Sequence, residues 1–327
     1  MMGTTTTARV DPRIFAGFAA TYILWGATLL AVAVALVSIP PFLLMGSRSL
    51  VGGLVLLAYA WHRGARPPAR LWLAAAGCGL LLFVGCHGLM AVAQQRVPSG
   101  VTAMIMATIP FWVAILGFVL PTSKPTRLLT LFVLIPGIAG VALIAWDPGS
   151  AAGNGPAFFD LGLLIASAFF WALGSILLER SNSQQVAAIA MSAMALIAGG
   201  AALLVVSAAT GEFARFSFGA LSWSSVLGWA YLVLAGTIVA FGSYVWLLER
   251  VTPTLVATYT FVNPVIAVLL GWAVLGETFA LTTLAGGGLV VISIIALLAL
   301  EGRGATRKER PARSADAQDL RQARACS

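Results

Sequence analysis

Ten long apolar segments divide the chain, and short polar or proline-containing stretches separate them. They cover residues 14–37, 42–61, 71–93, 97–120, 128–146, 161–178, 186–209, 226–248, 255–275 and 281–300. Each segment has about the 20 residues that a helix needs to cross the hydrocarbon core of a bilayer. Because a helix satisfies its own backbone hydrogen bonds in lipid, the pattern predicts an all-α integral membrane protein with ten transmembrane helices.

The composition supports this prediction and excludes an ordinary soluble domain. Hydrophobic residues make up 60% of the 327 residues and charged residues 9%, whereas a soluble domain carries roughly 25% charged residues. The mean hydropathy is +0.97. The three cysteines match neither a zinc spacing nor a disulfide framework, so we expect no metal site and no cofactor.

The basic residues predict the orientation of the chain in the membrane. Placing the N-terminus in the cytoplasm leaves Arg96 and Arg215 in outer loops and Arg48 within a span, and every other Lys and Arg on the cytoplasmic side. Cytoplasmic loops carry an excess of these residues. We therefore predict a multi-pass protein of the cell (inner) membrane with both termini in the cytoplasm. Residues 1–13 form the N-terminal tail, and the polar residues 301–327 form a disordered C-terminal tail.

The two halves of the chain resemble each other over residues 14–147 and 160–300. Matched residues recur at nearly constant offsets, and they are Thr21 and Trp25 with Ser167 and Trp171, and Arg96, Val97 and Pro110 with Arg250, Val251 and Pro264. Each half contains five spans, so the second half enters the membrane from the opposite side. The sequence therefore predicts two inverted five-helix repeats, with a substrate site between them near the midplane of the bilayer.

Polar and aromatic side chains inside the spans are the candidate substrate-binding residues, because such groups are costly in lipid unless they serve a purpose. The candidates are Trp25, Arg48, His87, Gln94, Thr108, Trp112, Trp171, Ser175, Tyr244, Tyr259 and Asn263. Arg48 either contacts an anion or carboxylate in a cavity, or it extends to the interface or pairs with helix carbonyls. His87 either carries protons or is a structural histidine bonded to a carbonyl.

Two prolines lie in the middle of corresponding spans. Pro110 and Pro264 are predicted to bend or break their helices, which is a mark of the substrate region in transporters. The alternative is a tolerated kink without a gating role. No Asp or Glu lies in the middle of a predicted span, so His87 is the best candidate for proton coupling.

Several short motifs share the order and spacing of a known transporter family. They are Leu24-Trp25-Gly26, Pro40-Pro41 with Arg48, Val97-Pro98-Ser99-Gly100, and the run from Arg250 through Asn263-Pro264-Val265 to Leu275-Gly276-Glu277. Over residues 14–300 the chain resembles the EamA-type proteins of the drug/metabolite transporter superfamily, and within them the YedA-like exporters. The resemblance implies ten helices in two repeats, cytoplasmic termini and export of small metabolites or drugs. Thr122-Ser123 stands where family members often have Gly-Glu, so no acidic role is carried over to the first half.

We therefore predict a secondary transporter that exports small metabolites or drugs across the cytoplasmic membrane by alternating access. The expected partners are a small-molecule substrate and the lipid bilayer, and not nucleic acid. A homodimer, the substrate and the coupling ion stay open. The alternatives are a non-transporting sensor or scaffold and an intramembrane enzyme. We expect no catalytic residues, because the chain lacks Walker A, GxSxG and HExxH motifs.

Overall fold

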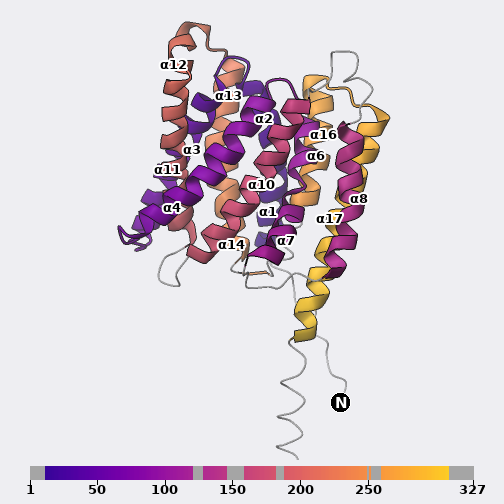
Figure 1. The fold of residues 1–327 in the computed structure, drawn as a ribbon. Coiled ribbons are helices and arrows are strands. Elements are labelled where there is room, and N and C mark those ends of the chain that lie inside the picture. The colour runs from indigo at the N-terminus through magenta and orange to yellow at the C-terminus, as the bar shows by residue number, and fades with distance from the viewer. Residues whose placement is uncertain are drawn as a thin grey trace, which may run out of the picture.

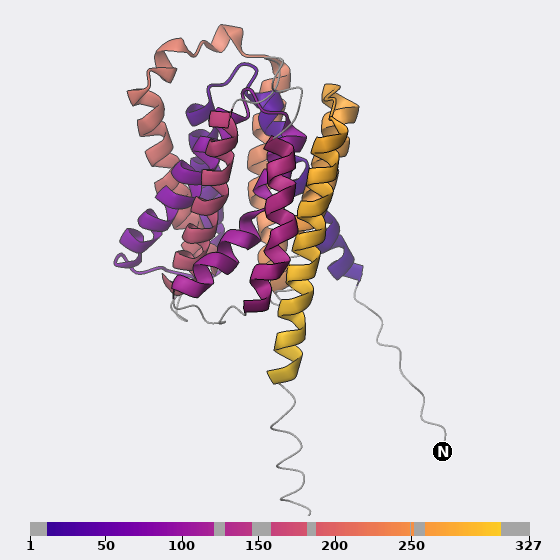
Figure 2. The ribbon, with the colours of Figure 1, turned by 45° about the vertical axis from the view of Figure 1, so that its right-hand side comes forward.

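The computed structural model describes residues 12–120, 128–145, 158–181, 188–248, 250–251 and 259–308, and every element within them is a helix. Both predicted tails lie largely outside this part of the chain. The final helix runs past residue 300, where the last predicted span ends, and continues to Lys308. The first helix begins and the last helix ends at the lower end of the bundle in Figures 1 and 2.

The helices follow one another along the chain with short connections. The first half contains α1 (Pro12–Ala19), η1 (Ala20–Leu24), α2 (Thr28–Ala35), α3 (Pro41–His62), α4 (Leu71–Gly79), η2 (Leu80–Gly88), α5 (Leu89–Ala93), α6 (Ser99–Met106), α7 (Ile109–Val119) and α8 (Leu128–Ala145). The second half contains α10 (Phe158–Ser181), α11 (Ala188–Ala209), α12 (Glu212–Arg215), η3 (Phe218–Ala220), α13 (Trp223–Tyr231), η4 (Leu232–Val239), α14 (Ala240–Leu248), α16 (Tyr259–Leu275) and α17 (Leu281–Lys308).

Seven stretches of described helix are long and apolar enough to cross a membrane. They are Pro12–Ala35, Pro41–His62, Leu71–Ala93, Ser99–Gly117, Phe158–Leu178, Ile189–Ala209 and Trp223–Tyr244. Three shorter apolar helices cover Ile135–Ile144, Val262–Leu275 and Leu281–Ala296. The prediction of an all-helical integral membrane protein agrees with this arrangement.

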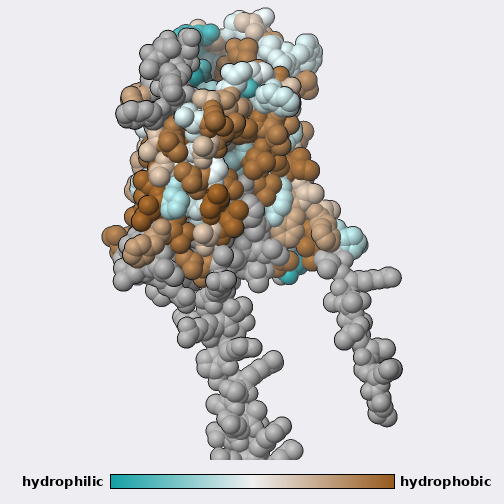
Figure 3. Space-filling model, turned by 90° about the vertical axis from the view of Figure 1, so that its right-hand side faces the viewer, coloured by the Kyte–Doolittle hydropathy of each residue, from teal (hydrophilic) through white to brown (hydrophobic). Residues whose placement is uncertain are grey.

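The outside of the bundle is apolar where lipid would surround it. Leu73 and Trp272 are 83% and 65% exposed, although both are large hydrophobic residues. Figure 3 shows a broad hydrophobic band across the face that carries α8 and α17, with hydrophilic residues gathered above it. Such a surface is costly in water and matches the hydrocarbon core of a bilayer.

Glycines bring α3 and α11 into backbone contact. A Cβ atom on Gly200 would lie 2.6 Å from the Leu50 nitrogen and 2.9 Å from the Gly46 oxygen. One on Gly53 would lie 3.0 Å from the Ala193 oxygen. The residue number falls along one helix as it rises along the other, so the two helices are antiparallel. Small residues of this kind are the usual means by which transmembrane helices approach each other.

The helices α8 and α17 form a second antiparallel pair, on the other side of the bundle (Figure 1). A Cβ atom on Gly140 would collide with the Gly286 oxygen, and one on Gly286 would collide with the Gly140 oxygen. Further along the pair, the Ser293 hydroxyl donates a hydrogen bond to the Val133 carbonyl. These contacts hold the last described helix of the first half against the last helix of the second.

The glycine contact between α8 and α17 makes the first prediction. Gly286→Ala places a methyl group against the Gly140 carbonyl, and we expect it to lower the free energy of unfolding by about 1 to 3 kcal/mol, as overpacking does. Gly288→Ala is the matched control, since nothing lies within 4 Å of a Cβ there. Thermal unfolding of the purified proteins in detergent measures both, and equal midpoints for the two variants would contradict the packing described here.

Candidate functional site

The first aromatic cluster is built around Trp25, which follows the π-helical segment η1. Its ring centroid lies 4.8 Å from that of Tyr259 and 5.3 Å from that of Tyr244. The two tyrosine rings are 6.0 Å apart and perpendicular. Trp25 belongs to the first half of the chain, and both tyrosines belong to the second. Three sequence-predicted residues therefore meet where the halves join.

The second cluster contains His87 and Trp171, whose ring centroids are 5.3 Å apart, and Phe83, whose ring is 5.2 Å from His87. Phe83 and His87 lie on the π-helical segment η2, and Trp171 lies on α10. The His87 Nδ1 atom is shielded from solvent and has no hydrogen-bond partner. This cluster also joins the two halves. Its tryptophan belongs to the second half and its other rings to the first, whereas in the first cluster the tryptophan belongs to the first half. No ring contact links it to the first cluster among the described residues.

Backbone carbonyls near the π-helical segments are satisfied by side chains from the opposite half. Trp25 Nε1 donates to the Gly236 oxygen in η4 at 2.8 Å, and Tyr231 donates to the Leu24 oxygen at 3.0 Å. In the orientation that suits its neighbours, the Asn263 amide nitrogen donates to the Tyr22 oxygen at 3.3 Å. A π-helical turn displaces carbonyls from the regular helical ladder, and in lipid each one needs another donor. Hydrogen bonds to these carbonyls therefore link the two halves of the chain.

The remaining predicted residues contribute less to these clusters. Trp112 packs edge-on against Phe169 at 5.5 Å. Thr108, in the break after α6, donates to the Ile105 carbonyl of α6, and Ser175 donates to the Trp171 carbonyl of its own helix, at 2.7 Å in each case. Gln94 donates to the Leu29 oxygen at 2.6 Å, and its own Oε1 atom has no partner.

The two prolines differ in their surroundings. Pro110 follows a break at residues 107–108, which separates α6 from α7. Pro264 lies inside α16, which is continuous from Tyr259 to Leu275. The described helices are therefore interrupted beside the first proline and uninterrupted at the second.

Arg48 lies on α3 and is only 8% exposed. Its Nε atom is shielded from solvent and has no hydrogen-bond partner. The helix α3 packs against η2, the segment that carries Cys86 and His87.

Three carboxylates that sequence reasoning left aside join the halves at one end of the bundle. Glu277 accepts hydrogen bonds from the Ser99 and Gly100 nitrogens at the start of α6, at 2.7 and 3.1 Å. Glu212 likewise accepts from the first nitrogens of α3, the nearer at 2.9 Å. Prolines at these helix starts were the available signal, since the first N–H groups of a helix lack internal partners.

The third carboxylate forms an ion pair. Arg96 donates from Nε and from a terminal nitrogen to the two oxygens of Asp160, at 2.8 and 2.6 Å. These hydrogen bonds raise the pKa of Arg96 above its ordinary value. The contact joins the connection before α6 to the first turn of α10. Because Arg96 is half exposed, the pair adds little to stability by itself and chiefly fixes the position of these two elements.

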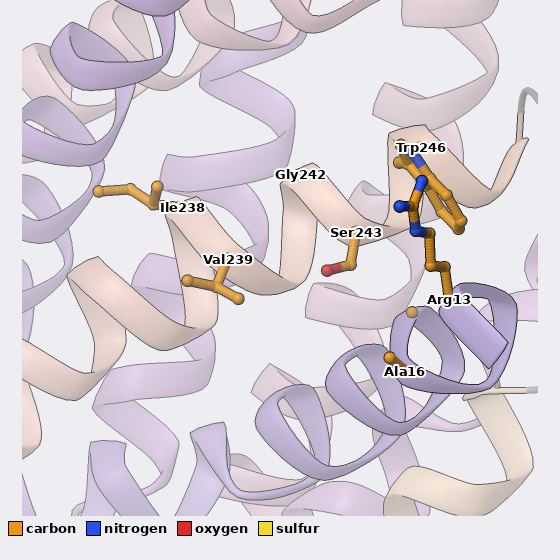
Figure 4. Close-up of a pocket in the computed structure, with 8 residues that line it drawn as sticks. Arg13, Ala16, Ile238, Val239, Gly242, Ser243 and Trp246 are labelled. Atoms are coloured by element: carbon orange, nitrogen blue, oxygen red, sulfur yellow. The ribbon is translucent and has the colours of Figure 1, made fainter.

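Two described grooves lie away from the aromatic clusters. One, of about 560 Å³, lies between α1 and the segments η4 and α14; Figure 4 shows Arg13 reaching toward Trp246 at one end of it. The other, of about 420 Å³, lies beside the start of α3 and includes Glu212 and Arg215. Neither groove is lined by a sequence-predicted binding residue. Among the described residues, no group of three or more His, Cys, Asp or Glu side chains could hold a metal ion.

Comparison with known proteins identifies the family. The sequence profile of the EamA-like transporter family matches the chain twice, over residues 13–146 and 159–299. The chain belongs to the EamA-like transporter family. The chain is 34% identical over 285 residues to the uncharacterized inner membrane transporter YedA of Escherichia coli K12, covering 86% of this chain and 89% of that protein. These findings support a multi-pass transporter of the inner membrane.

Two further relatives and one solved structure agree with this assignment. The chain is 31% identical to the uncharacterized transporter YvbV of Bacillus subtilis, over 83% of this chain and 87% of the relative. It is 26% identical to a probable amino-acid metabolite efflux pump of Salmonella typhimurium, over 83% of this chain and 90% of the relative. A crystal structure of a protein 20% identical to it superposes with a TM-score of 0.60, over 90% of this chain and 99% of that one. This last likeness supports the fold alone.

The helix caps give the second prediction. Glu277→Ala leaves the Ser99 and Gly100 nitrogens without their acceptors, and we expect it to lower the free energy of unfolding by about 1 to 2 kcal/mol. Glu277→Gln keeps one acceptor oxygen and should lose less. Chemical denaturation in detergent ranks the variants, and a Glu277→Ala protein as stable as the wild type would show that the cap is dispensable.

Proposed function

We propose that this protein is a secondary transporter that exports small organic solutes across the inner membrane by alternating access. The observation that carries the proposal is the pair of aromatic clusters around Trp25 and Trp171, because each is assembled from both halves of the chain. A solute bound there would contact both halves of the chain, and these halves can move relative to each other. Relatives named as transporters and as an efflux pump support the same class of function.

We further propose that the chain forms ten transmembrane helices in two inverted repeats. The seven long spans and the three shorter apolar helices each overlap one of the ten predicted segments. The two profile matches divide the chain where the proposed repeats divide. Such repeats are a known architecture of secondary transporters.

The helix pairs support an axis between the repeats. In the proposed scheme α3 and α11 are the second helix of each repeat, and α8 and α17 are the fifth. Each pair is antiparallel and meets through glycine. Helices related by a two-fold axis in the membrane plane cross in this way, because the axis reverses their direction. The π-helical segments η2 and η4 also fall in corresponding spans, the third and the eighth.

The carboxylate contacts suggest which end is closed. Glu212, Glu277 and the Arg96–Asp160 pair all join one half to the other at the end where α3, α6 and α10 begin. By the distribution of basic residues this is the outer end, and both termini are cytoplasmic. We therefore propose that the passage to the outside is shut in this conformation. Opening it requires these contacts to separate or to move as a unit.

The third prediction tests transport directly. Purified protein in liposomes should move at least one solute of a panel of amino acids, aromatic acids and lipophilic amines when a gradient is imposed. Trp25→Ala and Trp171→Ala should each reduce the flux at least about tenfold, because each removes a cluster's central ring.

Trp272→Ala is the control for this experiment, since that indole is exposed on the outside of the bundle. Its flux should match the wild type. The absence of flux for every solute, or equal losses from all three tryptophan variants, would contradict the proposal. Unchanged flux in both cluster variants would contradict the placement of the site.

A further inference from the structure

The guanidinium group of Arg48 stands out because no charge in the described interior balances it. Arg48 lies about 10 Å along α3 from Pro41, at a rise of 1.5 Å per residue, and is 8% exposed. Among the described residues, no hydrogen bond or ion pair to its side chain is formed, and its Nε atom is shielded from solvent. An ionised group in this setting is strongly unfavourable unless something compensates it.

The acidic side chains that the structure places are all occupied elsewhere. Asp160 binds Arg96, Glu277 caps α6, and Glu212 caps α3 while accepting a further bond from Ser207 at 2.9 Å. Each of them lies at a helix end. Among the described residues, therefore, Arg48 has no acidic partner.

The surroundings of Arg48 give the chemistry of the missing group. His87 lies on η2, which packs against α3, and its Nδ1 atom is a second shielded nitrogen without a partner. The His87 ring in turn contacts Trp171 and Phe83. The site thus offers the guanidinium group of Arg48 and the Nδ1 atom of His87 beside an aromatic surface.

We propose that Arg48 binds the carboxylate of the transported solute, which is an organic monoanion with an aromatic or apolar part seated against His87 and Trp171. This inference rests on the proposed transport function and narrows it to a substrate class. A planar guanidinium pairs with a carboxylate through two parallel hydrogen bonds. One cation balances one negative charge, which favours a monocarboxylate over a doubly charged phosphate. Lipophilic cations are disfavoured, because they would bring a second positive charge beside the first.

Three probes with the same ring separate the possibilities. Phenylacetate carries the carboxylate, phenylacetamide is its neutral counterpart, and phenethylamine carries a positive charge. Each is titrated against purified protein in detergent, and the rise in thermal midpoint gives its affinity, since a ligand of the folded state raises apparent stability. Wild-type protein should bind phenylacetate at least about tenfold more tightly than the other two. Equal or weaker binding of phenylacetate overturns the inference.

Substitutions test the residue. Arg48→Met and Arg48→Gln remove the charge at similar volume, and either should abolish the preference for phenylacetate while leaving the binding of phenylacetamide within about twofold. Arg66→Gln is the control, since Arg66 is exposed between α3 and α4, and it should keep the wild-type preference. Ligand-free Arg48→Met should also unfold at a temperature equal to or above that of the wild type, because it loses an uncompensated buried charge. A preference for phenylacetate that persists in either Arg48 variant overturns the proposal, whether or not Arg48→Met is less stable than the wild type.

Flux measurements keep this inference separate from the proposed function. If phenylacetate binds selectively through Arg48 but no probe crosses the liposome membrane, the anion site stands and transport fails. If solutes cross the membrane but the charge at residue 48 does not change which solutes are transported, the transport function stands and the anion site fails.

Discussion

Close antiparallel contact between glycine-bearing helices is the constraint on which the rest of this structure depends. In lipid no hydrophobic force draws apolar helices together, so association relies on packing and on hydrogen bonds between helices. The α3–α11 and α8–α17 pairs supply the packing, with backbone atoms separated by less than a side chain would allow. Further close glycine contacts between the halves lie at Gly79 against the Ala195 oxygen and at Gly228 against the Ala31 oxygen. The aromatic clusters and the capped helix ends therefore occupy fixed positions around a common seam.

The polar contacts along that seam are distributed unequally. One end of the bundle holds three carboxylates that each join one half to the other. Between the ends lie the rings of both clusters and the guanidinium group of Arg48. Carboxylates at helix starts satisfy N–H groups that would otherwise be unpaired, and they are favoured by the helix dipole. At this end the described carboxylates are all paired, whereas the buried Arg48 has no acidic partner among the described residues.

The sequence predicted the all-helical membrane fold, and it predicted some of the residues that form the aromatic clusters, whereas their role in binding stays a prediction. Hydropathy and segment length sufficed to predict an all-helical membrane protein, because lipid allows few alternatives to a helix. The repeat offsets led to Trp25 and Trp171, which do occupy clusters between the halves. Thr108 and Ser175 instead donate to carbonyls three and four residues earlier in the chain, since a hydroxyl in a span often donates one turn back. Neither the π-helical segments nor the partners of Glu277 could be predicted, because both depend on contacts between residues far apart in the chain.

The central claim is that the seam between the halves opens alternately to the two sides of the membrane. Accessibility of a single thiol tests it most directly, using Ser175→Cys on α10, one turn from Trp171, in protein whose natural cysteines are replaced. A membrane-impermeant maleimide is applied to oriented vesicles from one side and then from the other. Our account predicts modification from both sides, with a transported solute slowing both reactions. Modification from one side alone under all conditions, or from neither, would contradict it.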